Sequence, residues 1–317
     1  MKKVRCAAYL LVISIIIICT WAFTSWAIDF PTRPVTLLVG FAPGGPSDIQ
    51  ARSIALASEP FLGQPIVVSN KPGATGMLML TTLANSKPDG YTLAAPPGSL
   101  GSIVHFTKVD FNLITDFTYL VALGTPTESI SVRADSPWKT LKDLIEYARQ
   151  NPNQVKVGET GLGSSPGLIT RGVAKQAGVQ WTMVPFKSGG EIIPALLGGH
   201  IHVGANSGEH LPLVKAGNLR LLANFTPQRV KEFPDVPTLR ELGFDFVTFC
   251  IFGVLGPKGL PEPIAQKLVE VFTKGKKTTA WQETLKTMSL VPVDASGKDF
   301  EQIMIAHYGK IANLIKR

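Results

Sequence analysis

The sequence predicts an α/β fold divided into two domains. Along most of the chain, short apolar runs alternate with amphipathic stretches, which is typical of β-sheets flanked by helices. The length of 317 residues suits roughly two domains of average size. With 45% hydrophobic and 17% charged residues, the chain has enough apolar side chains for a sizeable core. This composition excludes a disordered protein, a collagen-like repeat and a long coiled coil.

The first 27 residues resemble a secretory signal peptide. Three basic side chains at 2–5 precede an apolar stretch at 6–23, and the sequence SWA at 25–27 resembles a cleavage site. We therefore expect export, cleavage near Ala27 and a mature chain that begins near Ile28. Retention of the segment as a membrane anchor is the alternative, because the apolar stretch approaches the roughly 18 residues that begin to span a bilayer.

Cleavage also changes the cysteine content and the charge. It removes two of the three cysteines and leaves Cys250, so the mature chain folds without an internal disulfide. It leaves 28 basic and 23 acidic residues, a net charge of +5. These charges are scattered, and the densest basic cluster, at 274–277, is interpreted as a solvated helix end. Because nucleic-acid binders gather their basic residues and interleave them with aromatic ones, we expect no nucleic-acid partner.

The first predicted domain opens with strands joined by helices. Three apolar runs have the length of buried strands, at 35–41, 65–69 and 91–95. A helix is expected at 47–59, with Asp48 in its first turn, where negative charge suits the helix dipole. Arg52 lies one turn later and is expected to pair with Asp48. The loop at 70–76 is expected to open a further helix.

The chain is then expected to cross between the domains twice. Two strand-like runs at 117–123 and 129–133 are separated by the sequence GTPT, which places the first crossing near residue 125. The apolar run at 247–255 is expected to carry the chain back. We therefore predict a signal segment at 1–27, a discontinuous first domain at 28–125 plus 247–317, and a second domain at 126–246.

The alternation continues between the crossings and after them. We expect strands at 155–158, 183–185, 201–204 and 219–225. We expect helices at 138–149, at 192–197 and from the loop 161–167 to about 177, and two terminal helices at 263–273 and 300–315. Because no repeat of 20 to 50 residues is visible, the sequence does not predict a solenoid or a propeller.

Two strand-to-helix loops, at 41–48 and 160–167, carry the strongest chemical signal. The first amides of a helix have no intrahelical partner and carry partial positive charge, and glycines let a ligand approach the backbone. Ser47, Ser164 and Ser165 add hydroxyl donors. The pair of loops therefore predicts a site for a carboxylate or phosphate. For either loop alone, the alternative is a tight turn.

The second loop also permits a catalytic interpretation. The sequence GSSPG at 163–167 fits the G-x-S-x-G elbow of α/β-hydrolases, with Ser165 as nucleophile. The acid and base of a triad would then be Asp235 or Asp245 with His307. Against this, Pro166 has no N–H to give to an oxyanion hole, where the residue after the nucleophile normally contributes one. The hydrolase is therefore kept only as the alternative function.

A metal site is a further alternative. His200 and His202 would share one face of a strand and would bind a metal with Glu209 or His210. The other interpretation is that they are ordinary polar residues at a strand edge. Since the chain has no H-E-x-x-H, Walker A or G-x-G-x-x-G sequence, we expect neither a metal nor a cofactor.

Seven short motifs occur in a fixed order along the chain. They are FAPGGPSD at 41–48 with Arg52, NKPGA at 70–74, PDGYTL at 88–93, GLGSSP at 161–166, VPFK at 184–187, LLGGH at 196–200 and FPDVPT at 233–238. In this order they resemble the substrate-binding proteins of tripartite tricarboxylate transporters, also called the Bug family of periplasmic receptors. The resemblance covers essentially the whole mature chain.

This resemblance implies a fold and a function. The fold would be the two-domain periplasmic binding protein fold of type II, in which each domain is a mixed, mostly parallel sheet flanked by helices. A small organic carboxylate would be held in the cleft between the domains, and the domains would close on it by a hinge near residues 125 and 247. The partner would be a membrane transporter of the tripartite tricarboxylate type, or a sensor. The resemblance implies no catalysis, and the receptor is expected to be a monomer.

The resemblance also implies which residues bind the ligand. They are Phe41, Ala42, Pro43, Gly44, Gly45, Ser47 and Asp48 in the first loop; Gly161, Gly163, Ser164 and Ser165 in the second; and, on the remaining walls, Pro97, Gly98, Ser99, Phe186, Lys187, Ser188, Asn206 and Ser207. Two positions depart from the family pattern. Gly167 stands where many members carry His, and His202 where many carry Asp. Both departures are expected to change which distal group of the ligand is accepted.

Overall fold

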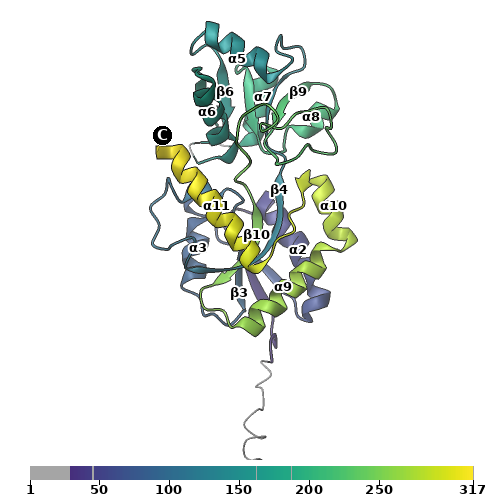
Figure 1. Ribbon diagram of the computed structural model, residues 1–317. Helices are drawn as coiled ribbons and strands as arrows, with labels where there is room; N and C mark the ends of the chain where they lie inside the picture. The colour runs from purple at the N-terminus through teal and green to yellow at the C-terminus, as the bar shows by residue number, and fades with distance from the viewer. Residues whose placement is uncertain (1–28, 45, 162, 187, 317) are drawn as a thin grey trace, which may run out of the picture. The chain divides into compact units, whose positions relative to one another are not determined.

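Two mixed β-sheets form the scaffold of the protein (Figure 1). The computed structural model describes residues 29–44, 46–161, 163–186 and 188–316. The predicted signal segment and the mature start at Ile28 lie outside these residues. From residue 31 onward the chain forms one compact unit. Within the described residues, every helix is too short or too polar to span a bilayer.

The first sheet has six strands in the order β11-β4-β10-β3-β1-β2. Their bounds are β1 Val35–Val39, β2 Ile66–Asn70, β3 Thr92–Ala95, β4 Phe117–Pro126, β10 Phe252–Pro257 and β11 Leu290–Val291. β1 pairs in parallel with β2 and β3, whereas β10 is antiparallel to β3 and β4. The sheet therefore joins strands from the first 126 residues of the chain to strands beyond residue 250.

The second sheet has five strands in the order β7-β6-β8-β5-β9. They are β5 Ser129–Arg133, β6 Lys156–Glu159, β7 Thr182–Pro185, β8 Val203–Asn206 and β9 Leu219–Asn224. β6 is parallel to β7 and β8, and β5 is antiparallel to β8 and β9. Both sheets are mixed, as expected. Their antiparallel share is larger than expected, because the strands that carry the chain between the sheets run against their neighbours.

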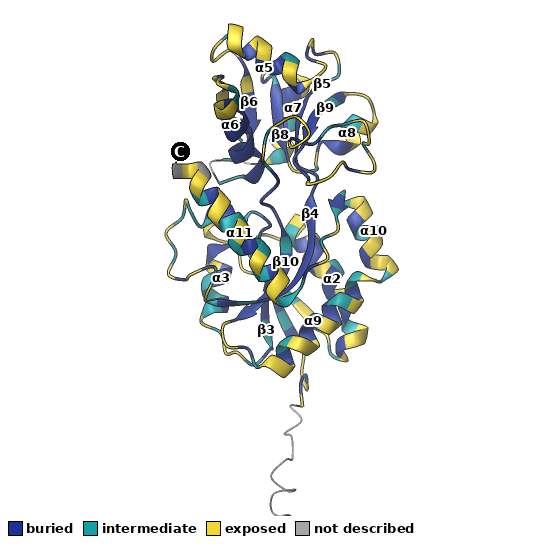
Figure 2. Ribbon diagram, viewed as in Figure 1, coloured by how far each residue is buried: buried dark blue, intermediate teal, exposed yellow. Residues whose placement is uncertain are grey.

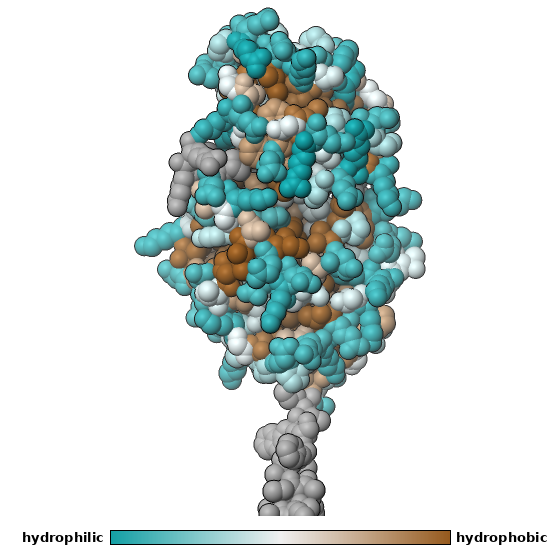
Figure 3. Space-filling model, viewed as in Figure 1, coloured by the Kyte–Doolittle hydropathy of each residue, from teal (hydrophilic) through white to brown (hydrophobic). Residues whose placement is uncertain are grey.

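Helices flank both sheets. Those packed with the first sheet are α2 Pro46–Leu62, η1 Ala74–Gly76, α3 Met77–Ala84, α4 Leu100–Ile103, α9 Glu262–Lys276, α10 Thr279–Thr287 and α11 Gly297–Lys316; those of the second are α5 Leu141–Gln150, α6 Ser165–Ala177, α7 Gly189–Leu197 and α8 Leu211–Lys215. Figure 2 shows that they turn buried faces inward and exposed faces outward. On the face in Figure 3, hydrophilic side chains cover most of the surface.

Local capping decides where helices begin and end. The helix predicted at 138–149 begins at Leu141, because the hydroxyl of Thr140 accepts a bond from the Asp143 N–H while the Asp143 carboxylate accepts from the Thr140 N–H. Sequence patterns missed α10, whose buried residues are only Trp281 and Leu285. Two apolar side chains give too weak a period to identify a helix.

The first crossing is shorter than predicted. β4 continues through Pro126, because β11 pairs with it at Thr125 and Pro126, so only Thr127 and Glu128 separate it from β5. On the return, residues 247–251 are irregular and strand β10 begins at Phe252. The domain limits of 28–125 with 247–317 and 126–246 stay a prediction, since residues 31–317 form one compact unit.

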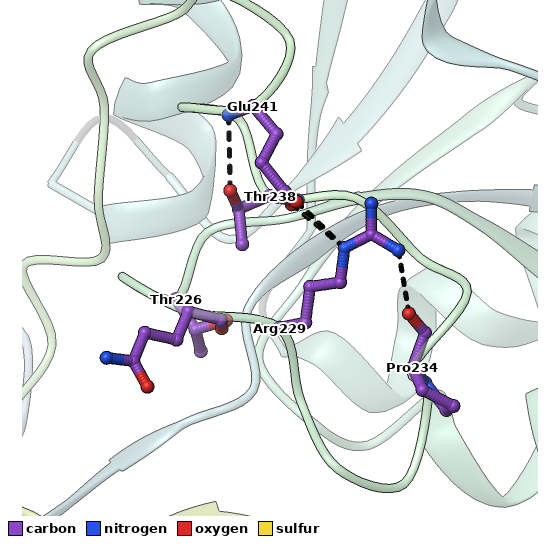
Figure 4. Close-up of polar contacts among 6 residues, drawn as sticks. Thr226, Arg229, Pro234, Thr238 and Glu241 are labelled. Carbon is purple, nitrogen blue, oxygen red and sulfur yellow. Dashed lines mark hydrogen bonds and ion pairs between the residues drawn. The ribbon is translucent and has the colours of Figure 1, made fainter.

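The motif FPDVPT at 233–238 belongs to a network of hydrogen bonds with Arg229 and Glu241 (Figure 4). The guanidinium of Arg229 donates to the Glu241 carboxylate at 2.9 Å and to the Pro234 carbonyl at 2.8 Å. The Thr238 N–H donates to the same carboxylate at 2.7 Å, and the Glu241 N–H donates to the Thr238 hydroxyl at 3.3 Å. These bonds fix a long loop after β9, which explains the motif without a role in binding.

Candidate functional site

A pocket of about 570 Å³ is lined by loops that follow strands of both sheets. Nine of the predicted site residues line it: Phe41, Ser47, Pro97, Gly98, Ser99, Ser164, Ser165, Ser188 and Ser207. Eight others are not among its lining residues: Ala42, Pro43, Gly44, Asp48, Gly161, Gly163, Phe186 and Asn206. Gly45 and Lys187 lie outside the described residues. Ligand contact at all these positions stays a prediction.

Three helices direct their first turns at this pocket. Pro46 and Ser47 come from α2, Ser165 from α6 and Gly189 from α7. The first amides of each helix lack an intrahelical acceptor, and each helix end carries a partial positive charge. Since α2 flanks the first sheet and α6 and α7 the second, the positive ends of helices reach the pocket from both sides. Such an arrangement suits an anionic group.

The first loop is held by the side chain of Asp48. Its carboxylate accepts bonds from the Gly44 N–H and the Arg52 Nε, both at 2.9 Å, and from the Asn70 amide at 2.7 Å. The predicted pair of Asp48 and Arg52 is thus confirmed. The hydrogen bond from Arg52 is the main cause that lowers the pKa of Asp48 to about 2. The carboxylate is therefore engaged within the loop and orders it.

Gly44 is required by the shape of this loop. Its φ of 86° lies in the left-handed region, which side chains disfavour. A Cβ at this position would have no atom within 4 Å, so the strain would come from the backbone and not from crowding. The loop therefore needs glycine here for a reason other than close ligand approach.

The second loop is tied to both sides of the pocket. The Ser164 hydroxyl accepts from the Gly167 N–H at 3.3 Å and caps α6. The Gly163 carbonyl accepts a 2.7 Å bond from the Ser102 hydroxyl in α4. This bond connects the second loop to a helix that packs with the first sheet.

Sequence reasoning missed Glu128, which lies between β4 and β5. It is wholly buried and lines the pocket. Its carboxylate accepts from the Ser165 hydroxyl at 2.6 Å and from the Ser207 hydroxyl at 3.3 Å. Burial is the main cause that raises the pKa of Glu128 to about 7, against the hydrogen bonds from Ser165, Thr248 and Ser207. The position of an acidic residue between two apolar strand runs was the one feature of the sequence that could have indicated Glu128 as a site residue.

Glu209 is a second carboxylate at the pocket. It is exposed and accepts from the Ser207 N–H at 3.1 Å and from the Asn206 amide at 3.2 Å. It also lies against the start of α7, because a Cβ on Gly189 would collide with its carboxylate. Asn206, which was predicted to bind ligand, therefore supports Glu209 and accepts from the Ser131 hydroxyl at 2.8 Å.

Gln50 was also missed, because it looks like an ordinary polar residue of a helix. It lies one turn into α2, is only 2% exposed and lines the pocket. Neither its amide nitrogen nor its amide oxygen has a hydrogen-bond partner among the described residues. Leaving such a group buried and unpaired costs free energy, so Gln50 is poised to bond a ligand.

The hydrolase arrangement is not formed. The Ser165 hydroxyl donates to Glu128 and accepts from the Phe249 N–H at 3.1 Å. His307 stacks edge-on against the ring of Phe249, and Asp245 pairs with Arg240. Ser165 is thus engaged with a buried carboxylate instead of a histidine.

The two departures from the family pattern lie outside the pocket lining. A Cβ on Gly167 would collide with the carboxylate of Glu159, which fills the space. His202 precedes β8, where its Nδ1 accepts from the Lys156 N–H at 3.0 Å and its ring packs against Trp138. Within the residues that the structure describes, no group of three His, Cys, Asp or Glu side chains could hold a metal ion.

Sequence comparisons identify relatives over most of the chain. Residues 50–317 match the profile of the tripartite tricarboxylate transporter family receptors. A UPF0065 protein from the gbd 5' region of Cupriavidus necator is 36% identical over 273 residues, which cover 86% of this chain and 84% of the relative. BugT of Bordetella pertussis is 31% identical over 275 residues, covering 84% and 83%.

Solved structures of similar proteins share the fold. A TctC solute-binding protein from Polaromonas has a TM-score of 0.82 at 31% identity, covering 90% of this chain and 99% of that one. MatC from Rhodopseudomonas palustris with bound malate has a TM-score of 0.75 at 28% identity, covering 90% and 100%. An R. palustris protein with adipate has a TM-score of 0.77 at 29% identity, covering 91% and 98%.

These matches decide between the functions that the sequence left open. The matched profile covers most of the chain and describes receptors. The alternative of a serine hydrolase is therefore wrong, in agreement with the partners of Ser165. The chain belongs to the tripartite tricarboxylate transporter receptors of the Bug family, and it is a solute-binding receptor with the two-domain type II periplasmic binding protein fold.

Proposed function

We propose that the protein captures a small organic carboxylate in the periplasm and delivers it to a membrane transporter of the tripartite tricarboxylate type. The observation that carries this proposal is the convergence of the first turns of α2, α6 and α7 on one pocket. Their amides donate hydrogen bonds and their dipoles favour a negative group. Two similar structures hold malate and adipate, which are carboxylates of a size that suits such a pocket.

The export signal and the two crossings complete the proposal. The predicted signal peptide at 1–27 supports export of the mature chain to the periplasm. Hinge motion at the crossings near residues 125 and 247 lets the second sheet and its helices close over the ligand. The bond from the Ser102 hydroxyl to the Gly163 carbonyl joins α4 to the loop before α6, and we expect it to form when the domains close.

A binding screen tests this function. Adipate and malate are titrated into the mature protein by calorimetry, with adipamide as the control, because it has nearly the same shape without charge. We expect at least one carboxylate to bind and adipamide not to bind. A carboxylate at 100 times its dissociation constant would stabilise the fold by about 2.7 kcal/mol, which a thermal melt detects. If folded protein binds no carboxylate of a wider set, the proposed function is wrong.

A further inference from the structure

A second pocket, of about 480 Å³, lies apart from the site described above. Its walls are α6, the C-terminal end of α11 and the segment 245–249 of the return crossing, and Figure 1 shows this end of α11 beside α6. Among the described residues, this α6–α11 pocket shares no lining residue with the first pocket, of about 570 Å³. Its volume lies within the roughly 300–1,000 Å³ that is usual for small-molecule sites.

Three apolar side chains form one wall of the α6–α11 pocket: Phe246, Val247 and Phe249. Phe249 belongs to the core of the second sheet, and Phe246 packs against that core. The ring of His307 in α11 also packs edge-on against Phe249, with 5.8 Å between the ring centroids. Because packing holds these rings in place, a ligand that lies on them pays little to order the wall. The wall therefore favours an aromatic or aliphatic group.

Two lysines from different helices line the same pocket. Lys175 lies in the last turn of α6, and Lys310 lies near the end of α11. Both residues are exposed, so their stems can cover apolar surface while the ammonium groups reach water or an anion. An ammonium group has three donors, so either lysine can bond a ligand in addition to a protein partner. The acidic lining residue Asp245 is engaged by Arg240 at 3.2 Å. The lysines therefore favour an anionic group.

Phe249 connects the two pockets. Its side chain lines the α6–α11 pocket, while its N–H donates at 3.1 Å to the hydroxyl of Ser165, which lines the first pocket. The same hydroxyl donates to Glu128 at 2.6 Å. The next residue, Cys250, also lines the first pocket. A molecule that moves or fixes Phe249 therefore acts on hydrogen bonds of the first pocket and on the return crossing.

We propose that the α6–α11 pocket is a second binding site, which takes a small organic anion with an aromatic or aliphatic group, and that its occupancy changes the affinity of the first pocket. The anionic group is bound between Lys175 and Lys310, and the apolar group lies on Phe246 and Phe249. The existence of this site is independent of the proposed function, and only the coupling rests on it.

Two matched fluorescent probes test the charge preference by titration into the mature protein. One is 8-anilino-1-naphthalenesulfonate, and the other is N-phenyl-1-naphthylamine, which has the same rings without the sulfonate. Lys310→Glu is expected to weaken the sulfonate probe at least fivefold and the neutral probe less than twofold, because only the anion loses an attraction and gains a repulsion. The control is Lys298→Glu, an exposed position at the other end of α11 and outside the pocket lining, with less than a twofold change expected.

A second pair of variants tests the apolar wall. Phe246→Ala removes a ring that lines the pocket, whereas Phe244→Ala removes a half-buried ring that packs against the same core without lining the pocket. We expect both variants to lose stability, but only Phe246→Ala to weaken both probes, by at least threefold.

Linked titrations test the coupling. The sulfonate probe at saturation is expected to change the affinity of a carboxylate from the binding screen at least threefold, and that carboxylate must change the affinity of the probe by the same factor. At the same probe concentration, Lys310→Glu is expected to lose the effect. An effect that persists in Lys310→Glu would mean direct competition in the first pocket and would overturn the coupling.

The remaining outcomes separate the site from the function. Unchanged sulfonate binding in Lys310→Glu, or equal losses in Lys310→Glu and Lys298→Glu, would overturn the site, and equal losses of both probes in Lys310→Glu would overturn its preference for anions. A carboxylate affinity that the bound probe leaves unchanged would overturn the coupling. If the probe binds this site and folded protein binds no carboxylate, the second site stands and the proposed function fails.

Discussion

Asp48 and Glu128 are both buried carboxylates, and their surroundings shift their pKa values in opposite directions. Arg52 donates to Asp48 and lowers its pKa to about 2, whereas Glu128 has only hydroxyl partners and burial raises its pKa to about 7. Asp48 is absent from the pocket lining, while Glu128 belongs to it. A carboxylate with its own cation stabilises the fold, whereas one without a cation carries a free-energy cost that a ligand can relieve.

The largest effect is expected from removing the charge of Glu128. Its pKa in the folded protein exceeds the ordinary value of 4.5, so the unfolded state ionises first as the pH rises. Below pH 4.5 the carboxyl group of Glu128 does not lower the free energy of unfolding. Between pH 4.5 and about 7 the folded state is increasingly destabilised, and above about pH 7 the destabilisation is constant. A rise to about 7 corresponds to a cost of about 3 kcal/mol.

We therefore expect Glu128→Gln to become more stable relative to the wild type as the pH rises from 5 to 8, measured as the difference in their free energies of unfolding. Urea unfolding without ligand at several pH values measures this difference, and the comparison cancels the titration of groups that both proteins share. Parallel curves for the two proteins would show that the carboxyl of Glu128 is not perturbed.

The opposite sign is expected for Asp48. Because its pKa is lowered, its contribution to stability is present above pH 3.8 and is lost as the pH falls toward 2. Asp48→Asn removes the ion pair with Arg52 and weakens the bonds from Gly44 and Asn70, so we expect a loss of about 1–3 kcal/mol at pH 7. Arg52 is half exposed, which keeps the loss in the lower part of that range.

Urea unfolding at pH 7 measures this loss against a matched control. Asp245→Asn breaks the pair with Arg240, in which the Asp245 side chain is 83% exposed, so its effect is expected below about 1 kcal/mol. Equal effects of the two substitutions would contradict a structural role for Asp48.

Asp48 and Glu128 also show which parts of the site the sequence can predict and which it cannot. The pair of Asp48 and Arg52 follows from helical spacing, because the residues lie four apart on one helix. The partners of Glu128 lie 37 and 79 residues away, at Ser165 and Ser207, and only the folded chain brings them together. Local patterns therefore predicted the loop, but not the buried carboxylate of Glu128 at the pocket.

The same distinction applies to the fold. The alternation of strands and helices is local, so the α/β class and the two mixed sheets were predicted and are confirmed. The end of β4 depends on its pairing with β11, which is more than 160 residues later, and the sequence indicated an interruption there instead. Gln50 illustrates the same limit, because its significance is its burial beside a pocket and not its place in a motif.

The smallest effect on stability, and the sharpest test of the loop before α2, is expected at Gly44. Gly44 and Gly243 have φ angles of 86° and 85°, and a Cβ at either position would meet no atom within 4 Å. Alanine at either site forces a left-handed conformation at a cost of about 1–2 kcal/mol, so the two variants are expected to lose similar stability.

Only Gly44→Ala is expected to change ligand binding, because this loop leads into α2 and the Gly44 N–H holds the carboxylate of Asp48. Relaxing its backbone would shift the first turn of α2 and weaken the binding of whichever carboxylate the screen identifies, whereas Gly243→Ala serves as the matched control with equal strain. Calorimetry and urea unfolding on both variants separate the two effects. Equal affinity in Gly44→Ala and the wild type would mean that the loop at 41–48 is only a turn and does not position the ligand.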